Sequence, residues 1–303
     1  MRIGVLDIGS NTGHLLIVDA IRGGPPIPAH SFKKSLRLAE HLDANDHVNP
    51  RGIAALTTFI ADALVEAEKL GCSTILTLAT SAIRDSANAD QVLATVNEAT
   101  GIDLRILPGE DEARLTFLAV RRWFGWSSGR LGVFDIGGGS LEMAIGRDET
   151  PDAAVSLPLG AGRLTREWLD HGASVAELRS HVRQAIASDA GRILREGPFD
   201  HAVATSKTFR SLARVLGAAP REEGPYIRRV IKRPDAAGLV DKLSALTVAQ
   251  IAQLPGVSLD RAHQMVAGAV VAEAVIDLFD VSELEICPWA LREGVLIEHQ
   301  DHL

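Results

Sequence analysis

The feature that most constrains the fold of this chain is a short phrase that occurs twice. VLDIGSNTGHLLIV occupies residues 5–18 and VFDIGGGSLEMAIG occupies residues 133–146. Aligned without a gap, the copies share Asp-Ile-Gly, and Thr12 corresponds to Ser140. Dense apolar runs are typical of strands, and Asp-Ile-Gly followed by small residues is typical of a turn. Each copy therefore predicts a β-hairpin, and two distant copies predict two similar domains rather than a solenoid.

Strand and helix patterns alternate through the rest of the chain, which predicts mixed α/β layers. Asn49 and the proline after it are typical of a helix start, and Gly71 is typical of a helix end. Residues 103–109 are expected to form a short strand. We expect two domains, residues 1–125 and 126–303, with a last helix that can pack back on the first domain.

Composition limits the class of protein. The 303 residues are 46% apolar and 23% charged, as in ordinary soluble domains. The chain begins directly with a strand pattern, and no apolar run approaches the ~20 residues of a membrane helix. Residues 265–279 are the most apolar, but Glu273 and Asp277 interrupt them, which predicts a buried helix. We therefore expect a cytoplasmic protein that does not bind membranes. The net charge of −8 argues against nucleic-acid binding, although a local basic patch could still hold a polyanion.

Several common site chemistries lack support in the sequence. Cys72 and Cys287 have no C-x-x-C spacing and sit beside apolar segments, which favours small buried hydrophobes in a reduced protein. The histidines show no zinc-binding spacing. Ser10, Ser140 and Ser206 have no convincing His/Asp partner in sequence, so a covalent serine mechanism is not expected.

The two hairpin tips have the composition of phosphate-binding loops. Glycines let backbone N–H groups approach an anion, and hydroxyls add donors without charge. Either loop alone could be a simple turn, but duplication with Asp7 and Asp135 retained favours phosphate binding. Carboxylates at the strand ends would suit Mg²⁺ or Mn²⁺, with waters and phosphate oxygens as further ligands. The candidate phosphate-binding residues are Gly9, Ser10, Asn11, Thr12, Gly137, Gly138, Gly139 and Ser140.

DIGSNT and DIGGGSLE, in this order, resemble the two phosphate motifs of the exopolyphosphatase/guanosine pentaphosphate phosphohydrolase family. TSAIRDSAN, LPGEDEARLTFLAV and SLPLGAGRLT also resemble family blocks. The family belongs to the actin, sugar-kinase and Hsp70 ATPase superfamily. The resemblance therefore implies two actin-like, ribonuclease H-like domains with mixed sheets flanked by helices and an interdomain cleft. It is closest to short two-domain actinobacterial members, and it makes a homodimer and a link to the stringent response plausible.

The resemblance also implies roles for two glutamates. GEDEAR places three carboxylates at a helix start, where they would complement the helix dipole. By spacing, the family's catalytic base corresponds to Glu112. Glu142 stands where the first repeat has His14, so the two copies differ at this position. The resemblance implies that Glu142 holds the attacking water or the metal together with Asp135; an exposed strand carboxylate is the alternative.

Other residues have two interpretations each. Arg84 corresponds to a substrate-contacting arginine of the family, but it could instead pair with Asp85. ATSKTF falls where the superfamily has a Gly-rich loop, so Ser206 and Lys207 could meet phosphate, or Lys207 could point to solvent. ATSKTF differs from that Gly-rich loop, which weakens the case for a pocket that binds a purine base. Arg292 lies in a segment whose family counterpart approaches the cleft.

Two basic clusters could guide a long polyanion or could be ordinary solvated charge. They comprise Lys33, Lys34 and Arg37, and Arg228, Arg229, Lys232 and Arg233.

These features predict a metal-dependent hydrolase that releases terminal phosphate from inorganic polyphosphate, with short chains preferred and with water activated by Glu112. The nearest alternative is a guanosine pentaphosphate (pppGpp) 5′-phosphohydrolase. An ATP-dependent kinase of the same superfamily and a non-catalytic polyphosphate or nucleotide sensor are further alternatives. Glu112 and Glu142 argue against the sensor, because carboxylates hinder the binding of a polyanion.

Overall fold

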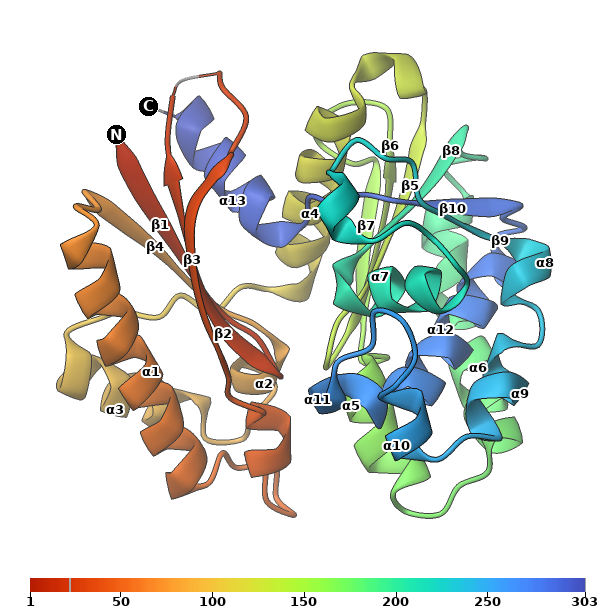
Figure 1. Ribbon diagram of the computed structural model, residues 1–303, viewed down its shortest axis with the longest axis horizontal. Helices are drawn as coiled ribbons and strands as arrows, with labels where there is room; N and C mark the ends of the chain where they lie inside the picture. Colours follow the sequence, from red (N-terminus) through yellow and green to blue (C-terminus); the bar gives the residue numbers. More distant parts are fainter. Residues whose placement is uncertain (22, 303) are drawn as a thin grey trace. The chain divides into compact units, whose positions relative to one another are not determined.

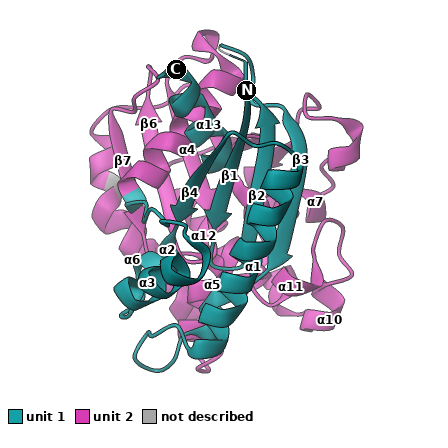
Figure 2. Ribbon diagram, turned by 90° about the vertical axis from the view of Figure 1, so that its left-hand side faces the viewer, with its two compact units in different colours: residues 1–109, 291–303 teal, residues 110–290 magenta. Residues whose placement is uncertain are grey.

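The structure is a computed structural model that describes residues 1–21 and 23–302. The chain forms two compact units (Figures 1 and 2): residues 1–109 together with 291–303, and residues 110–290. This division lies earlier in the chain than the boundary between residues 125 and 126 that the sequence suggested. The last helix groups with the first unit.

The first unit contains a four-stranded sheet and its helices. Its strands are β1 (Arg2–Ile8), β2 (Thr12–Asp19), β3 (Pro28–Ser35) and β4 (Thr74–Ala79). Its helical segments are η1 (Leu38–His41), α1 (Pro50–Lys69), α2 (Ser81–Arg84), α3 (Ala89–Thr100) and α13 (Leu291–Asp301).

The second unit contains a six-stranded sheet. Its strands are β5 (Leu131–Ile136), β6 (Leu141–Gly146), β7 (Ala153–Leu157), β8 (His201–Thr205), β9 (Val230–Lys232) and β10 (Glu283–Ile286). Its longer helices are α4 (Gly109–Phe124), α6 (Val175–Leu194), α7 (Ser206–Val215), α9 (Leu239–Ser244) and α12 (Met265–Leu278). Its short helical segments are η2 (Trp126–Ser128), α5 (Ala161–Leu164), η3 (Thr165–Leu169), η4 (Arg221–Glu223), α8 (Arg233–Ala236), α10 (Val248–Ile251) and α11 (Leu259–Ala262).

The repeat extends beyond the two hairpins to the whole sheet order. The first sheet has the order β3-β2-β1-β4, and the second has β7-β6-β5-β8 followed by β10 and β9. In both sheets the first three strands pair antiparallel, and the fourth pairs parallel to the first. The prediction of two similar α/β units with mixed sheets is therefore confirmed.

Alternation along the strands of the second unit divides its core into two parts. Phe134 and Ile136 face the large cluster that includes α6, α7 and α12. Leu131 and Val133 face the opposite side, where they pack with Phe117 of α4. Because successive side chains of a strand point to opposite faces, Asp135 and Glu142 belong to the α4 side.

The first unit shows the same separation of faces. Leu6 and Ile8 of β1 lie in a core formed with α1 and α3, which contribute Phe59 and Val96 among others. Asp7 therefore belongs to the other face of the sheet, where α13 contacts β1.

Most predicted elements are present with the expected ends. The Asn49 side chain accepts a hydrogen bond from Gly52 N at 3.0 Å and caps α1, and α12 is largely buried. Residues 103–109 are not a strand, because only Ile106 bridges β4 and Pro108 lacks the N–H that would extend the pairing. The short strands β7 and β9 were not anticipated. Among the described residues, no helix has the length and apolar character needed to cross a membrane.

Candidate active site

The first loop is held in place through its carbonyl groups. Gly9 N donates to Thr12 O at 3.1 Å and closes the turn. The amides of Leu36 and Arg37, just after β3, both donate to Asn11 O at 3.0 Å. Because these bonds occupy the carbonyl groups of the loop, its backbone N–H groups are the ones suited to binding an anion.

The second loop uses the same device. Gly137 N donates to Ser140 O at 2.9 Å, and the chain after β7 again supplies donors. Ala161 N donates to Gly137 O at 3.0 Å, and Arg163 N donates to Gly138 O at 2.9 Å. Both loops are thus rigid turns whose carbonyls are fixed by the segment that follows the third strand of the sheet.

Two glycines behind the second loop were not recognised as functional from the sequence. A Cβ on Gly160 would lie 2.3 Å from the backbone of Gly139, although its φ of −69° suits any residue. A Cβ on Gly162 would lie 3.0 Å from Gly138 O and from the Gln264 amide. The Gly-x-Gly spacing within SLPLGAGRLT was the available signal for this close backbone approach.

Asp7 lies at the end of β1, and its carboxylate is buried. Asp7 Oδ2 forms an ion pair with Arg292 Nη1 at 2.8 Å. Asp7 Oδ1 is also buried and has no hydrogen-bond partner among the described residues. His14 is paired with Asp7 across β1 and β2, and its Nε2 lies 2.8 Å from Ser31 Oγ. Asp7 is therefore neutralised by an arginine, and its second oxygen can accept a further cation or donor.

The turn after β4 lies beside the first loop. Ser10 Oγ and Ser81 Oγ are 3.0 Å apart. Arg84 donates to Asp85 Oδ1 at 2.9 Å and to Leu107 O at 3.1 Å, so the ion pair considered as an alternative for this residue is present. Its fixed guanidinium belongs to the same unit as the first loop.

The second unit brings carboxylates together. Asp135 and Glu142 are direct partners across β5 and β6, and both belong to the α4 face. Glu142 is 5% exposed, and its Oε1 accepts a hydrogen bond from Ser156 Oγ at 2.9 Å. Like charges at directly opposed positions of a sheet repel, so a cation between them is favourable.

Glu112 differs from the two acidic residues before it. Glu110 pairs with Arg192 at 3.0 Å and Asp111 pairs with Arg114 at 3.2 Å. Glu112, by contrast, is 7% exposed and lies in the first turn of α4, the helix that covers the face of Asp135 and Glu142. It is thus the one carboxylate of GEDEAR that is buried.

The turn between β8 and α7 adjoins the second loop, because Thr205 pairs with Asp135 in the parallel sheet. Ser206 adopts φ 81°, which is unfavourable for a residue with a Cβ and often marks a functional turn. Lys207 Nζ lies 3.1 Å from Ser258 Oγ. The left-handed position thus falls on Ser206, whereas Ala204 is an ordinary buried strand residue.

Arg261 is a charged residue near Asp135 that the sequence did not reveal. Burial and the nearby Arg210 lower the pKa of Arg261 to about 10, while the Asp135 carboxylate opposes this shift. Arg261 therefore stays protonated at neutral pH. An arginine just before the most apolar helix of the chain was the available signal.

The residues present fit a divalent cation bound together with its substrate. Within residues 1–21 and 23–302, no group of three or more His, Cys, Asp or Glu residues could hold a metal. The facing pair of Asp135 and Glu142 supplies two hard ligands, and Mg²⁺ typically keeps waters and phosphate oxygens as the rest.

The basic cluster of residues 228–233 is largely used within the protein. Arg228 pairs with Glu285 at 2.9 Å, and Arg229 donates to four backbone carbonyls. Arg233 pairs with Asp277 at 3.5 Å and with Asp280. These contacts favour a structural role over a track for a polyanion.

Comparison with known proteins places this site in a family. The model of the Ppx/GppA phosphatase family matches residues 17–302. The chain belongs to this family. Exopolyphosphatase 1 of Mycobacterium bovis is 51% identical over 305 residues, which cover 99% of this chain and 89% of that protein. Exopolyphosphatase 1 of Mycobacterium leprae is 48% identical, covering 99% of this chain and 90% of that protein.

Solved structures of Ppx/GppA proteins have the same fold. An exopolyphosphatase from Cytophaga hutchinsonii matches with a TM-score of 0.88 at 22% identity, covering 100% of this chain and 99% of its own. The Aquifex aeolicus family member matches with a TM-score of 0.79 at 21% identity, covering 99% and 97%. The actin-like fold that the sequence suggested is thereby confirmed.

Proposed function

We propose that this Ppx/GppA family member is an exopolyphosphatase that hydrolyses the terminal phosphoanhydride bond of inorganic polyphosphate, with short chains preferred. The observation that carries the proposal is the second hairpin, where Asp135 faces Glu142 beside a glycine loop and beneath the helix of Glu112. Relatives of about half-identical sequence carry the name exopolyphosphatase, which favours polyphosphate over pppGpp.

Binding of the phosphate groups falls to the loops and the cations near them. In the second unit we assign this role to residues 137–140, Ser206, Lys207 and Arg261. In the first unit we assign it to residues 9–12 and Arg84. Convergent backbone amides and hydroxyls bind a tetrahedral anion without adding charge, and the arginines balance the charge of the chain.

Glu112 is the proposed general base. It accepts a proton from a water molecule as the water oxygen bonds to the terminal phosphorus. The bond between that phosphorus and the bridging oxygen breaks, and the shortened chain leaves with its negative charge. The loop amides and Arg261 stabilise the charge that develops on the phosphoryl oxygens.

A divalent cation, Mg²⁺ or Mn²⁺, would be held by Asp135 and Glu142 in the second unit. In the first unit, Asp7 Oδ1 is also suited to a cation. The ion would supply positive charge for the phosphoryl oxygens. Glu142 also orients the attacking water in this proposal, and Ser156 fixes its carboxylate. We also propose that the protein acts in the cytoplasm and forms a homodimer, as the resemblance to the family implies.

A substrate panel tests the function. Purified protein with Mg²⁺ is assayed for phosphate release from tripolyphosphate, long polyphosphate, pppGpp and ATP. We expect the highest kcat/KM with short polyphosphate and no turnover after chelation of the metal. Faster hydrolysis of pppGpp than of every polyphosphate would instead assign the chain to the alternative activity. ADP formation that depends on an added acceptor would indicate a kinase.

A further inference from the structure

Arg121 on α4 is the largest fully buried side chain in the described part of the protein, with 1% exposure. Burial lowers the pKa of Arg121, yet a guanidinium stays protonated at neutral pH. The rings of Phe117 and Trp126 lie 5.8 and 5.9 Å from its central carbon. Because burying a charge is unfavourable, a guanidinium in this position must be compensated by well-placed acceptors.

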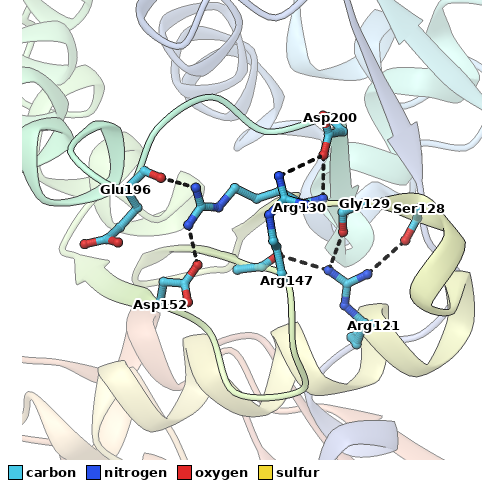
Figure 3. Close-up of polar contacts among 9 residues, drawn as sticks. Arg121, Ser128, Gly129, Arg130, Arg147, Asp152, Glu196 and Asp200 are labelled. Atoms are coloured by element: carbon cyan, nitrogen blue, oxygen red, sulfur yellow. Dashed lines mark hydrogen bonds and ion pairs between the residues drawn. The ribbon is translucent and has the colours of Figure 1, made fainter.

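The acceptors of Arg121 are neutral groups from the loop between α4 and β5 and from the end of β6; Figure 3 labels two of them, Ser128 and Gly129. Nη1 donates to Gly125 O at 3.1 Å and to Ser128 Oγ at 3.0 Å. Nη2 donates to Gly129 O at 2.8 Å and to Gly146 O at 3.0 Å. One planar group thus connects α4 to the loop before β5 and to the end of β6.

These contacts hold the end of α4 at the end of β6. Ala113 and Phe117 pack in one cluster with Ala144, so α4 covers this face of β6. A Cβ on Gly146 would lie 3.1 Å from the ring of Phe117, which leaves the helix little freedom to shift there.

The two glutamates lie at similar distances along their own elements from the contact between Arg121 and Gly146. From Gly146 back to Glu142, a strand covers about 13 Å. From Arg121 back to Glu112, a helix covers about 13.5 Å. A bond that fixes the helix at one end therefore fixes the axial offset between the two carboxylates at the other.

We propose that Arg121 is a positioning residue that sets the register of α4 on the β5–β6 hairpin and thereby the separation of Glu112 from Glu142. The inference rests on the proposed function for the roles of the two glutamates. The contacts of Arg121 themselves lie within one compact unit of the chain.

Arg130 is a matched control from the same corner of the sheet (Figure 3). Its guanidinium donates to Asp152 Oδ2 at 2.6 Å and to the carbonyl of Glu196. It therefore links the start of β5 to the start of β7 and to the residues after α6, and its loss removes a half-buried arginine without releasing α4.

The test compares Arg121→Met, Arg121→Lys and Arg130→Met, assayed with tripolyphosphate where each variant is fully folded by circular dichroism. We expect Arg121→Met to lower kcat at least about tenfold with KM within threefold, because small misplacements of catalytic groups have large effects. Arg121→Lys keeps the charge but has one nitrogen in place of a fork, and we expect a loss of about threefold or more. Arg130→Met should stay within twofold of wild type. Equal losses in Arg121→Met and Arg130→Met, or wild-type kcat in Arg121→Lys, would overturn the proposal.

Hydrogen exchange separates this proposal from the proposed function. The amides of residues 110–120 should exchange at least about tenfold faster in Arg121→Met than in Arg130→Met. If wild-type protein released no phosphate from any polyphosphate, the proposed function would be wrong. The exchange measurement would still test whether Arg121 sets the register of α4 on the β5–β6 hairpin. Equal exchange in the two variants would show that Arg121 does not hold α4. If Arg121→Met fails to fold, the same comparison is made with Arg121→Lys.

Discussion

The β1–β2 and β5–β6 hairpins share one backbone design but differ in chemistry. In each, the glycine after Asp-Ile donates to the carbonyl three residues later, at 3.1 Å in the first hairpin and 2.9 Å in the second. In each, the aspartate faces one residue across the strand pair. That residue is His14 opposite Asp7, and it is Glu142 opposite Asp135.

The helices that pack over the two aspartates also differ in the charge of the side chain that they bring. The first turn of α13 brings Arg292 to Asp7 at 2.8 Å, so the carboxylate meets a positive charge. The first turn of α4 instead carries the buried Glu112 over the face of Asp135. Under the proposed function, duplication has kept the scaffold and separated the roles. The first hairpin is neutralised and suited to binding, whereas the second gathers carboxylates suited to a metal and a base.

The largest expected effect comes from the base of the second hairpin's site. Glu112→Gln keeps the shape of the side chain but cannot accept a proton, so we expect kcat to fall about 10²- to 10⁴-fold with KM little changed. Phosphate release at saturating tripolyphosphate measures this. Glu110→Gln, at an exposed position of the same helix turn, is the control and should keep wild-type turnover. Near-wild-type turnover in Glu112→Gln would remove the assigned base.

A metal-binding measurement tests the difference between Glu142, which faces Asp135, and His14, which faces Asp7. Glu142→Gln removes one of two opposed carboxylates, and we expect the affinity for Mn²⁺ to fall about 10- to 100-fold. His14→Gln, at the equivalent position of the first hairpin, should leave it unchanged. Titration with Mn²⁺ followed by electron paramagnetic resonance measures both without substrate. Equal losses would place the ion elsewhere than the second hairpin.

The support behind the second loop is expected to be sensitive to a single methyl group. Gly160→Ala places a Cβ against Gly139, and overpacking of this kind lowers the free energy of unfolding by about 1–3 kcal/mol. We also expect KM for tripolyphosphate to rise. Gly191→Ala is the control, since a Cβ there meets nothing within 4 Å and an α6 alanine should stabilise by about 0.5–1 kcal/mol. Denaturation curves distinguish the pair, and a neutral Gly160→Ala would mean that the loop is not tightly supported.

The first hairpin should respond in binding and stability more than in turnover. Asp7→Asn removes the carboxylate charge from the ion pair with Arg292, which lowers the free energy of unfolding by about 1–2 kcal/mol. We expect KM to rise and kcat to stay within tenfold of wild type. Chemical denaturation and steady-state kinetics check the two effects. A kcat loss as large as that of Glu112→Gln would contradict the division of roles.

The sequence predicted the parts of the site that lie within the hairpins themselves. The duplicated phrase predicts both turns, and the difference between His14 and Glu142 is visible in a gap-free alignment. The start of α1 at Asn49 could also be predicted, because a helix cap depends only on residues that are close in sequence.

Contacts between distant segments could not be predicted in the same way. The partner of Asp7 is Arg292, which is near the other end of the chain. Arg261 reaches the surroundings of Asp135 only through tertiary packing. The buried Arg121 reads in sequence as one of two ordinary arginines near a helix end. Periodicity predicts whether a residue lies on a strand or a helix, but which helix face packs against which sheet face depends on the whole fold.

The turnover of two matched variants tests the central claim most directly. Glu142→Gln and His14→Gln change equivalent positions of the two hairpins to the same residue. With tripolyphosphate and saturating Mg²⁺, we predict that Glu142→Gln lowers kcat about 100-fold or more, as expected for loss of a group that acts in the transition state. His14→Gln should stay within about threefold of wild type, as expected of a substitution away from the reacting groups. Equal losses in both variants, or a larger loss in His14→Gln, would contradict the assignment of chemistry to the second hairpin.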